Sequence, residues 1–450
     1  MSISTAVVTV TISLGTGAAQ AASLTEPAIF CDAPYVGGRT YELSTEGLAE
    51  MITDGFTVND RGYLMASVMK AQEPRADSVL VYARSALTTS VVDFTPKVTT
   101  EGAVYSFDLQ YANISSTIEY TVQNGDDVDK ICDAIESLVD ASAAGIAGAA
   151  VAPDNSTATK LVFTGGTAGE PVIFKRINPA MITLLDVSTD GGIATDLAAA
   201  ALDSSFDGFV IDSFAEAENN AAAVWAEANE RLFFAQSGDT TNLGDATGTG
   251  VATDFKTANY GQSVVATNDA GMSDVGVAAL ARQFGFNPGL SSAAFQELNG
   301  VAAGAVRSSR ISTAQSKNVL LYALNGGNPH TWFGKLANGR SIRVQQVLDL
   351  LKVRIEEAVL TVFLSNEFVP MSTGGFARQE AAVRGVLSRF AAQGLIIPAG
   401  EDGGFTVTVP NVADVSDSDL SAGKLPNLRF SCAVLNDMLS VAVSGSIAFS

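Results

Sequence analysis

The sequence predicts a mixed α/β (α+β) protein with a mainly parallel sheet at its core, a small inserted strand-helix-strand domain and extended terminal arms. Short apolar strands alternate with helical segments over residues 25–91 and again over 200–300, which is the pattern of βαβ units. Residues 92–199 lie between them, are rich in Thr, Ser, Gly and Asn, and contain half-exposed strands. Both ends of the chain alternate small or polar residues with apolar ones, as strands do.

The first core segment contains two expected strands and two expected helices. Residues 28–31 and 78–83 are continuous apolar runs that predict buried strands. The Ser44-Thr45 pair can cap a helix that runs to about residue 53. Asp60 can cap a second helix, which Pro74 ends.

The inserted domain is predicted from a change of pattern. Residues 104–109 and 117–122 alternate like half-exposed strands, and 161–164 and 171–174 resume strands after a helix. The helix begins after an Asn-Gly turn, where either aspartate of the Asp126-Asp127 pair can cap it. Capping explains these aspartates better than a calcium site does, because the EF-hand order of ligands is missing.

The rest of the chain returns to alternating strands and helices and ends in strands. The expected elements are strands at 208–211, 233–236 and 263–267, helices at 214–232, 273–283, 344–362 and 377–392, and closing strands at 405–409, 428–430 and 439–449.

These patterns divide the chain into six expected segments. They are an N-terminal extended arm (1–24), a first α/β core part (25–91), an inserted, outward-facing β-rich domain (92–199), a second α/β core part (200–300), a C-terminal α+β domain that forms the inner assembly region (301–438), and a C-terminal arm strand (439–450).

The composition favours a structural subunit over an enzyme. Of 450 residues, 47% are hydrophobic and 16% are charged, against about 25% charged in ordinary soluble proteins. A surface with so little charge is typical of a chain that buries much of it against other chains. No run reaches the roughly 18 apolar residues of a membrane helix, so membrane insertion is not expected.

Charge is unevenly distributed along the chain. The net charge of -22 argues against nucleic acid as a partner, because phosphates require a positive field. Residues 301–400 carry eleven basic and five acidic residues, which gives +6 and leaves −28 for the rest. This asymmetry is explained equally well by a solvated face and by electrostatic pairing between copies or with a second protein. The candidate basic interface residues, facing a tube or a neighbour, are Arg340, Arg343, Arg378, Arg384 and Arg389.

Catalytic and cofactor sites are not predicted. The one histidine, His330, lies in a turn-rich stretch, and no motif places a nucleophile or carboxylate beside it. Neither a complete dinucleotide fingerprint nor a phosphate-binding loop occurs. Cys31, Cys132 and Cys432 are far apart, which predicts buried free thiols rather than a metal or disulfide framework. We therefore expect no catalytic residue, no metal and no cofactor.

The two ends of the chain are candidate strands for pairing with other subunits. The first 22 residues end like a signal peptide, yet the first basic residue is Arg39, so an extended arm is the better interpretation. An alternating arm without its own partner can add a strand to a neighbouring sheet. The candidate interface residues of the arms are Val7, Val8, Val10, Ile12, Val441, Val443 and Ile447.

An ordered set of weak motifs resembles the contractile phage tail sheath family over most of the chain. The early motifs are Tyr41-Glu42-Leu43-Ser44, Arg61-Gly62-Tyr63, Ala71-Gln72-Glu73-Pro74-Arg75 and Val79-Leu80-Val81-Tyr82. The late ones are the helix around Asp349-Leu350-Leu351, the helix at 377–392, Gly394-Leu395-Ile396-Ile397-Pro398-Ala399-Gly400 and Leu425-Pro426-Asn427-Leu428-Arg429-Phe430. Arg340 and Arg343 depart from the family, in which an acidic or neutral run is commoner there.

The resemblance implies a tail-sheath-like core and a structural role in a phage tail. It implies a homo-oligomer of hexameric rings stacked helically around a tail tube, whose contraction drives the tube through the host envelope. The implied partners are the tail tube protein and the baseplate and tail terminator proteins. The implied location is the virion, after assembly in the bacterial host cytoplasm.

Two other interpretations remain open. A secreted surface-layer or adhesin-like protein fits the acidic composition and the signal-like first residues. Another component of the same tail, in the baseplate or tube, fits the same motifs. A hydrolase is the weakest alternative, because no nucleophile motif is present.

Overall fold

The computed structural model describes residues 24–85, 87–111, 114–146, 152–157, 160–244 and 248–436. Their contacts group into a large unit, which comprises Thr25–Asn287 and Ser292–Ile342, and a small unit, which comprises Pro288–Ser291 and the chain from Arg343 onward. The six-segment division of the sequence stays a prediction.

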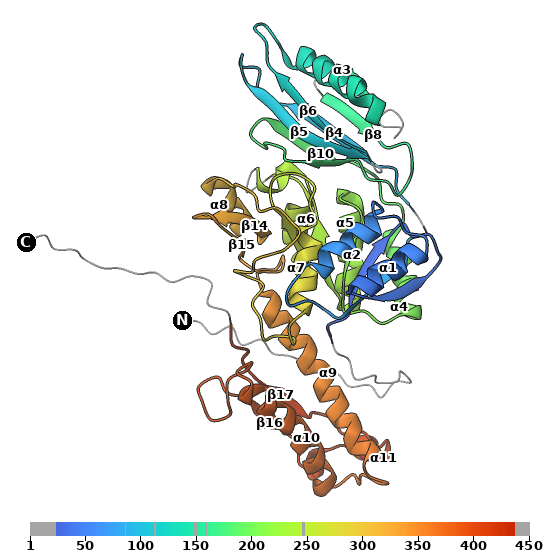
Figure 1. The fold of residues 1–450 in the computed structure, drawn as a ribbon. Helices are drawn as coiled ribbons and strands as arrows, with labels where there is room; N and C mark the ends of the chain where they lie inside the picture. Colours follow the sequence, from blue (N-terminus) through green and yellow to red (C-terminus); the bar gives the residue numbers. More distant parts are fainter. Residues whose placement is uncertain are drawn as a thin grey trace, which may run out of the picture. The chain divides into compact units, whose positions relative to one another are not determined.

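An eight-stranded sheet forms the centre of the large unit (Figure 1). Its strands in spatial order are β15 (Asn328–Trp332), β14 (Leu320–Asn325), β13 (Ser263–Thr267), β12 (Leu232–Gln236), β11 (Gly208–Ile211), β1 (Pro27–Cys31), β3 (Ser78–Ala83) and β2 (Gly38–Glu42). The six middle strands run parallel, and only the two edge strands are antiparallel. The mainly parallel sheet predicted from the sequence is therefore confirmed.

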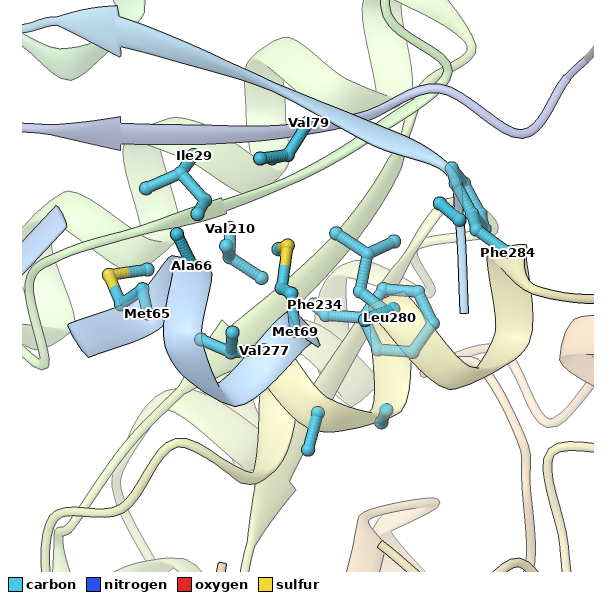
Figure 2. Packing of buried hydrophobic residues seen from close by; sticks show 14 of the residues in the cluster. Ile29, Met65, Ala66, Met69, Val79, Val210, Phe234, Val277, Leu280 and Phe284 are labelled. Atoms are coloured by element: carbon cyan, nitrogen blue, oxygen red, sulfur yellow. The ribbon is translucent and has the colours of Figure 1, made fainter. Parts of the chain in front are cut away.

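Successive residues of the middle strands point into two separate cores. Ile29 of β1 and Phe234 of β12 face a core under α1 (Thr45–Thr53), α2 (Arg61–Lys70) and α7 (Val275–Phe284), as Figure 2 shows for β1, β12, α2 and α7. Phe30 and Phe233 face the opposite core, under α4 (Ile193–Asp203), α5 (Glu216–Asn229) and α6 (Val251–Ala258). Burial of each such side chain contributes about 1.5–3 kcal/mol to the stability of the fold. Because helices cover both faces, the sheet is a rigid body.

The chain leaves this sheet after β3 and builds a separate module before it returns at α4. The module contains one sheet with the order β10-β4-β8-β7, a second with the order β6-β5-β9, and one helix. Its elements are β4 (Val91–Pro96), β5 (Val104–Tyr111), β6 (Ile114–Thr121), α3 (Val128–Ile146), β7 (Ala152–Thr157), β8 (Lys160–Thr164), β9 (Ile173–Lys175) and β10 (Ile182–Asp186). Phe94, Phe107, Phe163 and Phe174 pack against one another at its centre.

The small unit is built on two long helices. These are α9 (Ile342–Leu364) and α10 (Thr373–Ala392), which pack Leu351 and Ile355 against Val386 and Phe390. The short strands β16 (Thr406–Thr408) and β17 (Arg429–Ser431) pair antiparallel, and α11 (Asp417–Ser421) lies between them in the sequence. No helix of the described ranges has the length and apolarity needed to span a membrane.

Most expected elements are present, and a few were misplaced. Ser44 caps α1, and its Oγ accepts from the amide of Gly47 at 3.1 Å, as predicted. Asp60 precedes α2 but makes no side-chain cap, because its carboxylate accepts from the amide of Thr57 at 2.7 Å instead. The loop predicted around His330 is wrong, since His330 lies on edge strand β15 and stacks on Trp332. The expected strand at 439–449 lies outside the described residues.

Candidate functional site

The carboxyl ends of the parallel strands bring together a cluster of charges, all buried except the exposed Asp32. Asp32 follows β1, Arg84 follows β3 and Asp212 follows β11, and these three strands are neighbours in the sheet. Connections from β1 and β11 leave toward opposite sides of the sheet, which is the place where open α/β sheets form their ligand sites. The helices α4 and α5 begin beside it and contribute Asp196 and Glu218 from their first turns.

Arg84 is the centre of this cluster. Its side chain is 2% exposed, and its Nη1 donates to Asp212 Oδ1 at 2.7 Å and to Glu218 Oε2 at 3.2 Å. Its Nη2 donates to Glu218 Oε1, and its Nε lies 3.9 Å from Asp196 Oδ2. One guanidinium therefore holds three carboxylates from three different elements.

The charges of the cluster are set by burial and by this guanidinium. Burial acts to lower the pKa of Arg84, but Asp212 and Glu218 outweigh it and the pKa is raised. Burial raises the pKa of Asp212, whereas the hydrogen bonds from Arg84 outweigh burial at Glu218 and lower its pKa. Glu218 accepts the larger number of hydrogen bonds, and these favour its ionised form beside Arg84.

Asp196 and Glu218 also accept hydrogen bonds from the two connections that join the sheet to the inserted module. On the outgoing connection, the amide of Ser85 donates to Asp196 at 3.1 Å, and the Thr88 hydroxyl donates to Glu218 at 2.9 Å. On the returning connection, the amide of Gly191 donates to Glu218 at 3.2 Å. Glu218 thus links the sheet to both connections of the module.

A second buried contact ties the last strand of the module to the sheet. The Asp186 amide, at the end of β10, donates to Asp239 Oδ1 at 2.9 Å, and Asp239 follows β12. Burial raises the pKa of Asp186 to about 6, although hydrogen bonds from Ser188 oppose the shift. Burial also raises the pKa of Asp239 well above its usual range, since one of its oxygens has no partner among the described residues.

The cluster has no room for a ligand. The cavity bounded by Arg84, Asp186, Asp212 and Glu218 measures about 20 Å³, which holds about one water molecule. Pockets for small molecules are about 300–1,000 Å³. Across the described ranges, no three carboxylate, thiol or imidazole groups are placed to share a metal ion. The arrangement can act as a clamp on the module, and it leaves no space for a substrate.

The sequence contained a signal for this cluster that its motifs did not show. Asp32, Arg84 and Asp212 each stand directly after a predicted apolar strand, and the carboxyl ends of parallel strands meet at one edge. Asp196 and Glu218 could not be found in this way, because their helices had to be placed against the sheet first.

The structure separates the five basic residues predicted to form an interface. Arg340 lies exposed in the large unit. Arg343 begins the small unit, and its guanidinium donates to the backbone carbonyls of Gly289, at 3.0 Å, and Leu435. Arg378 and Arg389 lie on one exposed side of α10, whereas Arg384 lies on another side of this helix and pairs with Glu380 at 2.6 Å.

A groove lies between α9 and α10 within the small unit. It measures about 810 Å³, and Arg354, Arg378 and Arg389 line it. Small side chains such as Ala358 and Ala381 form its floor. Leu364 lies beyond it at the end of α9 with 77% of its side chain exposed, so this unit presents apolar and basic surface together.

The predicted arm residues lie outside the described ranges. These are Val7, Val8, Val10, Ile12, Val441, Val443 and Ile447. Cys31, Cys132 and Cys432 are buried free thiols, as the sequence predicted.

The fold is that of contractile sheath proteins, as the sequence resemblance predicted. The chain aligns with the sheath of an extracellular contractile injection system, solved as the PVC sheath complex in its contracted state, with a TM-score of 0.52 and 10% identity over 98% of each chain. It also matches the sheath tail protein of Desulfitobacterium hafniense, with a TM-score of 0.49 and 14% identity over 89% of this chain and 93% of that one. The contracted helical sheath of the anti-feeding prophage gives 0.48 and 11% identity over 97% and 98%. No family model and no curated protein matches the chain by sequence.

Replacing Arg84 by Met should destabilise the large unit by about 3–5 kcal/mol, because three buried carboxylates lose their counter-charge. The free energy of unfolding measures this loss, and limited proteolysis should begin in the connections at residues 84–90 and 187–192. Arg39→Met, which breaks an exposed pair with Asp54, is the matched control and should change stability far less. Equal losses for both variants would contradict the clamp.

Replacing Asp186 by Asn should change how stability depends on pH. The folded-state pKa of about 6 lies above the ordinary aspartate value of 3.8, so ionisation destabilises the wild type as pH rises between these values. Between pH 4 and 7 the variant should gain up to about 3 kcal/mol relative to wild type. Asp126→Asn should show the opposite slope, since hydrogen bonds from Tyr120 and Gln123 lower the pKa of Asp126. If the difference in unfolding free energy between Asp186→Asn and wild type, measured by chemical denaturation, does not change with pH, the raised pKa of Asp186 is refuted.

Proposed function

We propose that this chain is the subunit of a contractile sheath that surrounds the tube of a phage tail or of a related injection system. The observation that carries the proposal is the alignment of nearly the whole chain with a contractile injection system sheath, at a TM-score of 0.52 over 98% of both chains. The role proposed is structural, and the tight Arg84 cluster, with space for about one water, is consistent with it.

The proposed assembly is a set of hexameric rings stacked helically around a tail tube. A repeated head-to-tail contact builds an open helix, and such a contact requires two different complementary surfaces on each copy. The proposed partners are the tube protein and the baseplate and terminator proteins, with assembly in the host cytoplasm and a final location in the virion. Contraction, which ejects the genome in a phage, would be a switch between two packings of rigid bodies.

The doubly covered sheet of the large unit supports the rigid-body part of this proposal. Both faces of the middle strands are buried under helices, so the unit has little freedom to deform internally. Motion during contraction is then expected between units and between copies. The Arg84 clamp would keep the inserted module fixed to the sheet during that motion.

The small unit offers places where other chains can bind. The sheet of β16 and β17 has two short strands, and no third strand pairs with either among the described residues. A two-stranded sheet is marginal by itself, so addition of strands from the arms of neighbouring copies would stabilise it. The basic groove between α9 and α10 is the proposed surface toward the tube or a neighbour.

Negative-stain microscopy of the purified chain at high concentration tests the proposed function. Rings or hollow helical tubes are expected, because the interfaces are carried by the chain itself. Analytical ultracentrifugation over the same concentrations is the quantitative measurement. A monodisperse monomer at every concentration would exclude the sheath proposal.

Deletion of residues 1–14 or of 440–450 should prevent assembly and leave a folded body. The reason is that each arm would supply a strand to a neighbour, so its removal would take away a contact between copies. Circular dichroism checks the fold, and microscopy counts the tubes. Normal tubes from either deletion would reject the strand-exchange part of the proposal.

A further inference from the structure

A crevice with excess positive charge lies where the inserted module meets the sheet. It measures about 620 Å³, and its walls come from the loop Arg176–Ala180 of the module and from residues 268–270 and 305–310 of the large unit. The amide of Ile177 donates to the carbonyl of Ala270 at 3.1 Å and closes one end. The crevice is about thirty times larger than the Arg84 cavity, so it can accept side chains from outside.

Arg176, Arg307 and Arg310 line the crevice and Lys97 lies beside it; with the carboxylates of Asp108 and Asp269 the net charge is +2. Arg176 pairs with Asp108, and Arg310 pairs with Asp269. The other two cations have no carboxylate partner among the described residues: Lys97 donates to the carbonyl of Pro179 at 2.9 Å, and Arg307 is exposed. In a chain with a net charge of -22, this local excess is unusual.

The helix α3 of the module has the complementary charge. Asp129, Asp133, Glu136 and Asp140 recur at spacings of four, three and four residues, which places them on one face of the helix. Three of them are exposed and Glu136 is half-buried. Carboxylates four residues apart on one helix face repel one another, and cations from another chain would relieve that repulsion.

The two charged surfaces cannot meet within one copy. The helix α3 lies at the outer end of the module, whereas α8 (Ser308–Lys317), which begins beside the crevice, lies on another side of the large unit (Figure 1). Two different surfaces that match each other in charge are what a heterologous contact between copies requires. Because each copy carries -22, copies repel unless opposite charges meet locally.

We propose that the crevice around Lys97, Arg176, Arg307 and Arg310 receives the acidic face of α3 from a second copy of this chain. This contact rests on the proposed sheath function, because it presumes that copies assemble. It would join the module of one copy to the base of the next module, and it assigns a role to both charged surfaces.

Charge reversal and its rescue test the contact in the full-length chain. Lys97→Glu with Arg307→Glu reverses the two cations that have no carboxylate partner and leaves the Arg176 and Arg310 ion pairs intact. Asp133→Lys with Asp140→Lys reverses the α3 face. Each double variant should raise the concentration needed for assembly by about tenfold or more, because like charges then face each other. Combining all four substitutions should restore assembly to near the wild-type concentration.

Glu101→Lys with Glu119→Lys is the matched control. It makes the same change of net charge as the α3 double variant, in the same module but at exposed positions off the α3 face, and should leave assembly unchanged. Thermal melting confirms that each variant is folded, and sedimentation and microscopy measure assembly. If the wild type assembles and both double variants assemble equally well, this contact is overturned but the sheath proposal is not. The same conclusion follows if the quadruple variant does not restore assembly. A wild-type chain that never assembles overturns the sheath proposal and this contact with it.

Discussion

One buried guanidinium links the sheet to everything inserted into it. The chain leaves the sheet at Arg84, builds a module with its own core, and returns at α4. Arg84 and Glu218 hold both connections, so a module built on two exposed linkers is fixed to a rigid body. Removal of Arg84 would leave three buried carboxylates without a counter-charge, which is the costliest kind of single change. This interaction therefore fixes the module to the sheet.

The position of this cluster also explains why the fold has no ligand site where such sheets usually have one. In an open α/β sheet, the crevice beyond the carboxyl ends of the strands is the normal place for a substrate. Here the chain's own connections and side chains fill it, and space for about one water remains. The same geometry that could host catalysis in another protein serves here to attach a domain. Burial raises the pKa values of Asp186 and Asp239, so the stability of the junction is expected to depend on pH.

Charge has a different role on the surface, where it supports proposals about assembly rather than stability. Most of the chain is acidic, and the basic residues concentrate at the groove between α9 and α10 and at the crevice around Arg307. The sequence count of +6 over residues 301–400 indicated an asymmetry without locating it. The three-dimensional structure shows where these basic residues lie. Arg340 and Arg343 belong to different units, whereas Arg378 and Arg389 line one groove.

The sequence by itself determined the local elements and the class of fold. Apolar runs such as 208–211, the periodicity of α9 and α10, and the Ser44 cap are local signals. Each of these elements could therefore be predicted from its own segment of sequence. It misplaced His330, because Gly326 and Gly327 were read as part of a loop, whereas they form the two-residue turn that pairs β15 with β14. The Arg84 cluster depended most on tertiary structure, since its hydrogen bonds join residues up to 180 positions apart. Hydrogen bonds across such separations form only when the parallel sheet has ordered its strands, so only the tertiary structure could show that the charged ends of β3 and β11 meet.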